Sequence, residues 1–128
     1  MKLIFDPNLP IYLQIMAHMK RQLVSGILKP GERVAPVREL ALEYGVNPNT
    51  MQKALSELER AGYFVSERTA GRCVTADGAL IEGLREMEHE AVMGGFVEQT
   101  DALGIPREGL PERLSDYLLK HQEGGGLL

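Results

Sequence analysis

The sequence predicts a mainly helical α+β fold, and three observations support that prediction. Apolar residues recur at helical spacing over residues 11–24, 37–58, 79–103 and 112–119. Two short β-prone runs, 63–65 and 73–75, interrupt this pattern and favour a hairpin. The 128 residues, 44% of them hydrophobic, are enough for one packed core and a small appendage. We therefore expect one compact domain followed by a smaller helical unit.

The first helix is expected to begin at Ile11, after Pro7 and Pro10, and to end at Gly26. A Pro30-Gly31 turn signal follows it. The next pair, 33–34, is short enough to form a strand that pairs with the later hairpin.

Residues 37–58 predict two short helices joined by a sharp turn. Gly45 can adopt the positive φ that such a turn needs. Asn47 can cap the second helix, and Pro48 suits its first position. We expect this helix to end at Gly62. In a helix-turn-helix, the first residues of the second helix meet base edges in the major groove. In this chain those residues are Asn49, Thr50, Gln52 and Lys53.

The hairpin directly after this helix is placed like a wing, with its turn predicted at residues 69–72. Its tip, 67–72, carries Arg68 and Arg72 around the flexible Gly71. Such a tip can reach a phosphate backbone or the adjoining minor groove. The fold class predicted is therefore a winged helix-turn-helix domain followed by a small two-helix unit.

The distribution of charge agrees with this division. Residues 1–75 carry a net charge of +3 and residues 76–128 one of −7, which together give the −4 of the whole chain. Only the first part is therefore suited to face a polyanion.

The second unit is predicted to begin at a hinge at Asp77-Gly78, so that the chain divides into 1–76, 77–122 and a disordered tail, 123–128. Its long helix contains Gly94-Gly95, which should weaken it by roughly 1 kcal/mol per glycine. Either the helix kinks there, or another helix packs closely against the glycines. A last short helix is expected over 112–122.

Neither helix of this unit can bury its apolar face alone. Both could pack on the first domain, but we expect them to pack on a second copy, because DNA readers of this type bind two half-sites about 10 bp apart. The predicted dimerisation residues are Leu80, Leu84, Met87, Phe96, Leu103, Leu114 and Leu118.

Residues 26–75 strongly resemble the DNA-binding domain of the GntR family of bacterial transcription regulators. The resemblance is carried by LKPGERV, RELA, GVNPNT, LERAGY and the wing sequence TAGR, together with the upstream PIYLQI. The short acidic end of the chain, with its LGIPREGL turn, resembles the YtrA-type subfamily, in which this part is a dimerisation unit. The resemblance implies a homodimeric regulator that binds a pseudo-palindromic operator in double-stranded DNA. We expect this regulator to be a repressor.

Position by position, the resemblance implies DNA contacts by Arg38, which periodicity alone would leave as a solvated helix residue, and by Asn49, Thr50, Gln52 and Gly71. Two departures stand out: Ala35-Pro36 replaces the family's common Pro-Ser and removes a hydroxyl, and Cys73 replaces a common phenylalanine. The full set of predicted DNA-binding residues is Arg38, Asn47, Asn49, Thr50, Gln52, Lys53, Arg68, Thr69, Gly71 and Arg72. Ordinary polarity of a helix surface is the alternative explanation for Asn49, Thr50 and Gln52, whereas Lys53, Arg68 and Arg72 suit phosphate contact better than base reading.

Other classes find little support in the sequence. A single cysteine excludes an internal disulfide, and the absence of a signal peptide or membrane span predicts a cytoplasmic protein without membrane partners. The sequence shows no pairing of a nucleophile with a base that would predict an enzyme, and no cofactor is expected. Glu86-x-x-His89 is a possible metal pair, whereas His18 and His121 are isolated. Two alternative functions therefore stay open: a metal-responsive sensor, and a winged helix that binds another protein. The operator, the regulated genes and any small-molecule effector cannot be predicted.

Overall fold

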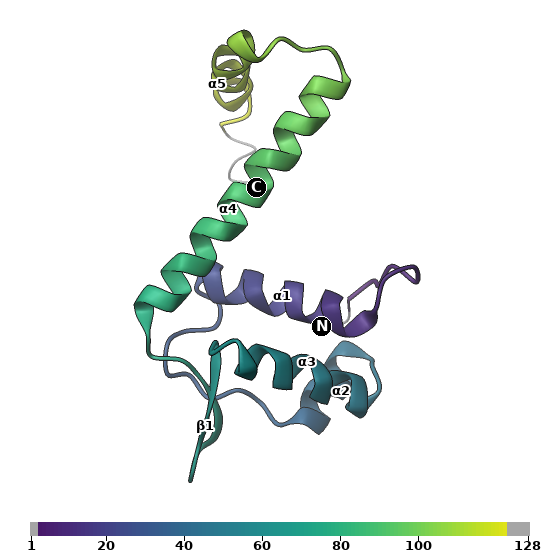
Figure 1. The fold of residues 1–128 in the computed structure, drawn as a ribbon, viewed down its shortest axis with the longest axis vertical. Helices are drawn as coiled ribbons and strands as arrows, with labels where there is room; N and C mark the ends of the chain where they lie inside the picture. The colour runs from purple at the N-terminus through teal and green to yellow at the C-terminus, as the bar shows by residue number, and fades with distance from the viewer. Residues whose placement is uncertain (1–2, 123–128) are drawn as a thin grey trace. The chain divides into compact units, whose positions relative to one another are not determined.

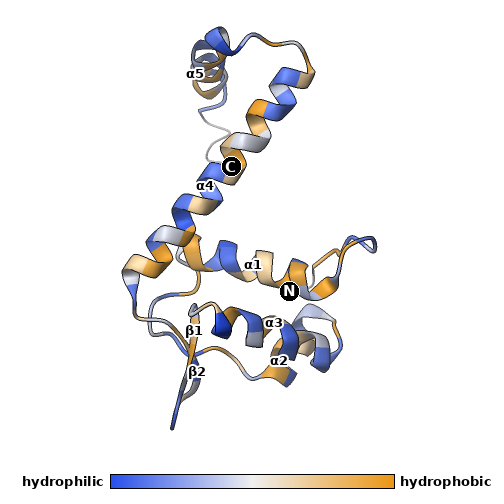
Figure 2. Ribbon diagram, in the orientation of Figure 1, coloured by the Kyte–Doolittle hydropathy of each residue, from blue (hydrophilic) through white to orange (hydrophobic). Residues whose placement is uncertain are grey.

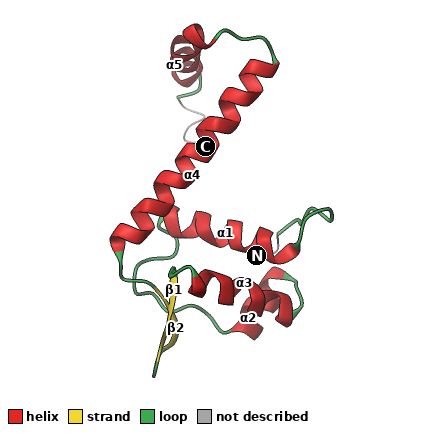
Figure 3. Ribbon diagram, in the orientation of Figure 1, coloured by secondary structure: helices red, strands yellow, loops and turns green. Residues whose placement is uncertain are grey.

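The computed structural model describes residues 3–122, in which five α-helices accompany one β-hairpin (Figures 1 and 3). The elements are α1 (Ile11–Ser25), α2 (Val37–Tyr44), α3 (Pro48–Arg60), β1 (Phe64–Glu67), β2 (Gly71–Val74), α4 (Gly78–Ala102), the 3₁₀ turn η1 (Arg107–Gly109) and α5 (Leu110–Lys120). The predicted α+β, mainly helical winged-helix architecture is confirmed. The predicted disordered tail, residues 123–128, lies outside the described residues.

Helices α1 and α2 both pack against α3, and Figure 1 shows the hairpin projecting from these three helices. The apolar stripe predicted on each helix forms the core. Its most deeply buried side chains are Ile15 of α1, Met51, Leu55 and Leu58 of α3, and Phe64 and Val74 of the hairpin. Alternation of these positions with polar ones leaves the opposite face of α3 in solvent.

The turn between α2 and α3 has the geometry predicted from its residues. Gly45 ends α2 with φ 73°, and its N–H donates to the carbonyls of Ala41 and Leu42. The Asn47 side chain accepts a hydrogen bond from the N–H of Asn49 at 2.7 Å, and Pro48 follows at the first helical position. The start of α3 is therefore firmly defined.

The hairpin is longer than predicted. β1 and β2 pair in antiparallel register from Phe64 opposite Val74 to Glu67 opposite Gly71. The turn therefore falls at residues 68–70, and the prediction of a turn over 69–72 is wrong because Gly71, at φ 79°, already pairs with β1. The predicted short strand forms a single bridge, Arg33 opposite Cys73. Backbone bonds on either side of it join Glu32 to Val74 and Val34 to Arg72.

Helix α4 runs without interruption through Gly94 and Gly95. A Cβ atom added to either glycine would meet nothing within 4 Å among the described residues. The predicted kink is therefore absent, and no helix among residues 3–122 packs against these glycines. Hydrogen bonds on both sides of the pair carry the helix across two residues of poor helical propensity.

The compact division of the chain falls between Glu88 and His89, so the first unit includes the first turns of α4. Ile81 and Leu84 are 6% and 2% exposed and belong to the core of this unit. Leu80 lies beside Gly62, with its Cδ2 3.3 Å from where a Cβ on Gly62 would lie. Leu84 is thus buried within the single chain, whereas Leu80 is partly buried; their place in a dimer face stays a prediction.

The second unit contains the rest of α4, η1 and α5. Helix α5 begins at Leu110, two residues before the predicted 112, because η1 and Pro111 start it early. A mostly apolar hollow of about 350 Å³ lies within this unit, lined by Phe96, Thr100, Ile105, Leu110, Arg113, Leu114 and Tyr117. It brings the predicted dimerisation residues Phe96 and Leu114 to one place. Within the described residues, no helix combines the length and apolar character that crossing a bilayer requires.

Replacing Gly94 and Gly95 by alanine is expected to stabilise the protein by roughly 1 kcal/mol per site, because both lie inside an exposed helix with free space around them. Thermal unfolding followed by circular dichroism measures this. Gly104→Ala is the control: it should destabilise, because Gly104 has φ 76°, where a side chain is strained. A loss of stability in Gly94→Ala or Gly95→Ala would instead place a partner's helix against the glycines.

Candidate nucleic-acid interface

The exposed face of α3 carries the residues that the sequence predicted for base contact. Asn49 and Gln52 are exposed and Thr50 is partly buried, whereas Met51, Ala54, Leu55 and Leu58 face the core. Asn47 is exposed too, but its side chain is engaged in the helix cap. The cap uses only the backbone N–H of Asn49. The Asn49 side chain therefore remains available to a ligand.

Gln52 is held by a residue that the sequence analysis missed. Its Nε2 donates to the Ser56 hydroxyl one turn later, at 2.8 Å. A primary amide has two N–H donors, so one N–H and the carbonyl oxygen stay free. These are the two groups that an amide needs to pair bidentately with adenine. The only sequence signal for Ser56 was its i+4 spacing from Gln52.

Lys53 has a different environment from its neighbours. Its ammonium lies 4.2 Å from the centroid of the Tyr12 ring of α1, which is a cation–π contact. The contact restrains the lysine at the edge of the exposed face of α3. From there it can add positive charge beside a phosphate.

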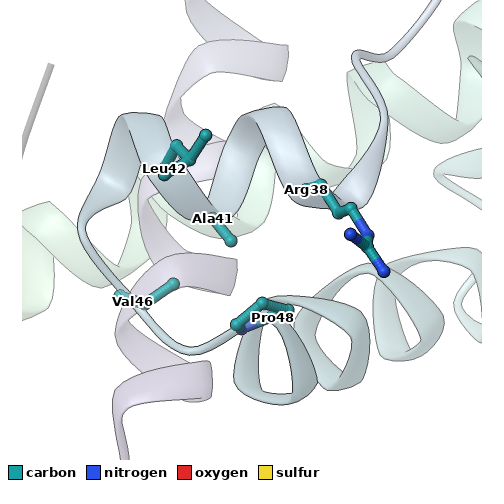
Figure 4. Close-up of a pocket in the computed structure, with 5 residues that line it drawn as sticks. All are labelled: Arg38, Ala41, Leu42, Val46 and Pro48. Atoms are coloured by element: carbon teal, nitrogen blue, oxygen red, sulfur yellow. The ribbon is translucent and has the colours of Figure 1, made fainter.

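Arg38 is exposed on the first turn of α2, at the rim of a shallow apolar depression of about 310 Å³ (Figure 4). Ala41, Leu42, Val46 and Pro48 complete its lining, and Leu42 is 79% exposed. The depression therefore joins α2 to the first residue of α3. An apolar surface beside a guanidinium can pack on a deoxyribose while the guanidinium pairs with the neighbouring phosphate.

The two arginines of the wing have different environments. Arg68 and Thr69 are exposed at the turn, where Figure 2 shows the hairpin tip in the blue of hydrophilic residues. Arg68 has no salt-bridge partner within residues 3–122. Arg72 instead pairs with Glu59 of α3, its Nε 3.0 Å from Glu59 Oε1, and is only 19% exposed. The structure thus keeps Arg68 available and engages Arg72 internally.

Arg33 is a further exposed cation that the sequence analysis did not select. It lies on the strand that bridges to β2 and lines a depression of about 200 Å³ together with Pro36, Ala70, Gly71 and Arg72. This places a positive charge between the wing and the start of α2, where the family's common hydroxyl is missing. Its only signal in the sequence was its position in the predicted third strand.

The Glu59 carboxylate predicts an acid-dependent loss of stability. Hydrogen bonds from Ser66 and Arg72 hold the pKa of Glu59 below its ordinary 4.5. A depressed folded-state pKa contributes stability above pH 4.5, which is lost as the pH falls through the lower folded-state value. The contribution should be no more than about 1 kcal/mol, because a third of the side chain reaches solvent. Melting temperatures across pH 2–6 should show a smaller acid dependence in Glu59→Gln than in the wild type; equal curves would contradict this.

Two of the remaining candidates, His18 and His121, each pack against a tyrosine. His18 packs edge-to-face on Tyr44 at 5.5 Å, and burial, more than the nearby Arg21, lowers the pKa of His18. His121 stacks on Tyr117. Among the described residues, no group of three or more His, Cys, Asp or Glu side chains is arranged to hold a metal, so Glu86 and His89 gain no third ligand within one chain.

A helix-turn-helix with an exposed polar start of its second helix, flanked by Arg38 and a basic wing, defines a winged-helix DNA-binding protein. Residues 11–74 match the family model of bacterial regulatory proteins of the gntR family. The chain belongs to this GntR family, as the sequence motifs indicated.

Individual comparisons agree with the family match. The chain is 38% identical to the HTH-type transcriptional repressor YtrA of Bacillus subtilis over 115 residues, which cover 87% of this chain and 88% of YtrA. A GntR family transcriptional regulator from Listeria monocytogenes superimposes with a TM-score of 0.79 and 32% identity, covering 88% of this chain and 98% of its own.

The DNA-binding domain of AraR, solved in complex with operator ORX1, superimposes with a TM-score of 0.53 and 25% identity over 59% of this chain and 95% of its own. The protein is thus a transcription regulator with a DNA-binding domain, and the prediction that it is not an enzyme is confirmed.

Proposed function

We propose that the protein is a cytoplasmic repressor that binds a pseudo-palindromic operator in double-stranded DNA as a homodimer. The observation that carries this proposal is the exposed first turn of α3, where the capped helix start presents Asn49 and Gln52 near the exposed Arg38, with the exposed Arg68 at the wing tip. In this arrangement the α3 side chains read bases, and the arginines bind the backbone. That YtrA is named a repressor, and that AraR was solved on an operator, supports the proposal by similarity.

The dimer is inferred from the second unit. Several large apolar side chains of α4, α5 and the link between them remain in solvent, among them Leu103 at 76%, Leu118 at 59%, and Phe96 and Leu114 at 38% each. An apolar surface of this kind is commonly covered by a partner. A second copy would cover it in both chains at once, and it would place two reading helices for two half-sites.

Repression follows if the operator overlaps a promoter, because a bound dimer then excludes the polymerase. A small-molecule effector could relieve repression only by binding one dimer geometry better than another. A promoter fused to a reporter, with and without the operator, tests the sign of regulation: expression should rise when the operator is deleted.

Fluorescence anisotropy tests the DNA function itself. Operator sequences are first selected from a random pool of double-stranded DNA, and one labelled duplex is then titrated at several salt concentrations. Phosphate contact predicts that log K falls with log salt by about 0.9 for each phosphate neutralised. A flat salt response would contradict DNA binding and favour a winged helix that contacts another protein.

A further inference from the structure

A single carboxylate ties the wing to the base-reading helix. Glu59, in the last turn of α3, uses both of its oxygens: Oε2 accepts from the Ser66 hydroxyl of β1 at 2.6 Å, and Oε1 accepts from Arg72 Nε of β2 at 3.0 Å. Ser66 and Arg72 are register partners across the hairpin. Glu59 therefore contacts both strands at the same register position. One further pair, Glu67 and Gly71, separates this position from the turn.

This link adds to backbone bonds that hold β2. Val74 N–H donates to the Glu32 carbonyl and Val34 N–H donates to the Arg72 carbonyl, while Tyr63 N–H donates to the Leu58 carbonyl just before β1. The side chains toward the tip are exposed, and a two-stranded hairpin is marginally stable without such support. The side-chain bridge therefore adds a restraint near the tip, and through Ser66 it also reaches β1.

The bridge is also partly withdrawn from solvent. The Arg72 side chain is 19% exposed and that of Glu59 32%, whereas Arg60, which pairs with Glu57 on the same helix, is 76% exposed. Ion pairs that are partly withdrawn from water are screened less than exposed ones. With its side chain 19% exposed and its Nε bonded to Glu59, Arg72 is less accessible to a phosphate than the exposed Arg68 at the turn.

We propose that Glu59 is a positioning residue that sets the wing against the recognition helix, and that Arg72 acts on DNA through Glu59 instead of contacting phosphate itself. The proposal replaces the direct phosphate contact that the sequence predicted for Arg72, and it rests on the proposed DNA-binding function. Arg68, at the turn, then makes the phosphate contact of the wing.

The sign of the Glu59→Gln effect separates positioning from simple charge. Removing a negative charge beside DNA should tighten binding if Glu59 only repels the polyanion. If Glu59 positions the wing, Glu59→Gln should weaken operator binding about fivefold, which corresponds to the net contribution of one ordinary hydrogen bond. Glu57→Gln is the matched control, because it removes the same charge from the same helix without a wing contact, and it should bind at least as tightly as the wild type. Equal or tighter binding by Glu59→Gln overturns the proposal.

The salt dependence tests the role of Arg72. Arg68→Ala should reduce the slope of log K against log salt by about 0.9, the value for one phosphate. Arg72→Ala should weaken binding about fivefold with an unchanged slope, and Glu59→Gln combined with Arg72→Ala should be no weaker than Arg72→Ala alone. A slope reduced by about 0.9 in Arg72→Ala would show a direct phosphate contact and overturn the proposal.

Hydrogen exchange of the free protein gives a readout that does not depend on DNA. Amides of residues 64–74 should exchange faster in Glu59→Gln than in Glu57→Gln, while those of α1 stay equally protected in both. Unchanged protection of the hairpin would overturn the positioning role even if the protein binds DNA. Faster exchange in a protein that shows no salt-dependent DNA binding would instead refute the proposed function and leave the bridge intact.

Discussion

Leu114→Glu is expected to convert the proposed dimer into a monomer and to weaken operator binding by about a hundredfold or more. Leu114 lines the apolar hollow of the second unit with Phe96 and Tyr117, and it is 38% exposed. A carboxylate there would lose its hydration on dimerisation without gaining a partner, which is costly. In a monomer the two DNA-binding domains are no longer linked, so binding at one half-site no longer raises the effective concentration at the other. Such linkage typically raises the overall affinity by a factor of about 10² to 10⁴.

Sedimentation velocity measures the dimer, and anisotropy on full and half operators measures binding. Ile27→Glu is the matched control: Ile27 is 64% exposed in the link after α1, so the same charge change should leave the dimer and its affinity intact. Leu114→Glu should bind an isolated half-site as well as the control does, because its reading head is unaltered. A variant that stays dimeric and retains full affinity would show that this hollow is not the dimer face.

Gln52→Ala is expected to cost about 1–3 kcal/mol of discrimination at one base pair of each half-site, the usual worth of a bidentate amide contact. The Ser56 hydroxyl holds the Gln52 side chain on the exposed face of α3 while one N–H and the carbonyl oxygen remain free. The variant should therefore bind its best and its mutated operators with nearly equal affinity, while the salt slope stays as in the wild type.

The measurement compares binding to a panel of operators that differ at single base pairs. Gln99→Ala, an exposed glutamine of α4 in the second unit, is the control and should leave every preference unchanged. Ser56→Ala should produce a smaller loss at the same base pair as Gln52→Ala, because it frees the rotamer without removing the amide. If Gln52→Ala keeps the full operator preference, base reading belongs to other residues of α3.

The sequence by itself determined the features whose causes lie within a few residues. Gly45 predicted the turn, because a residue without a Cβ adopts φ 73° without strain. Asn47 and Pro48 defined the start of α3 because the cap and the first helical position are local. The apolar period then assigned Met51 and Leu55 to the core, and the predicted reading residues Asn49 and Gln52 fell on the opposite, exposed face.

Only the tertiary structure decided between residues that look alike in the sequence. Arg68 and Arg72 both lie near the wing tip, but Glu59, thirteen positions before Arg72, engages only the latter. Leu84 and Leu114 both belong to amphipathic helices, but only Leu84 meets the core of the first unit. These outcomes depend on which surfaces the fold brings together, because burial and ion pairing are properties of contacts between distant segments.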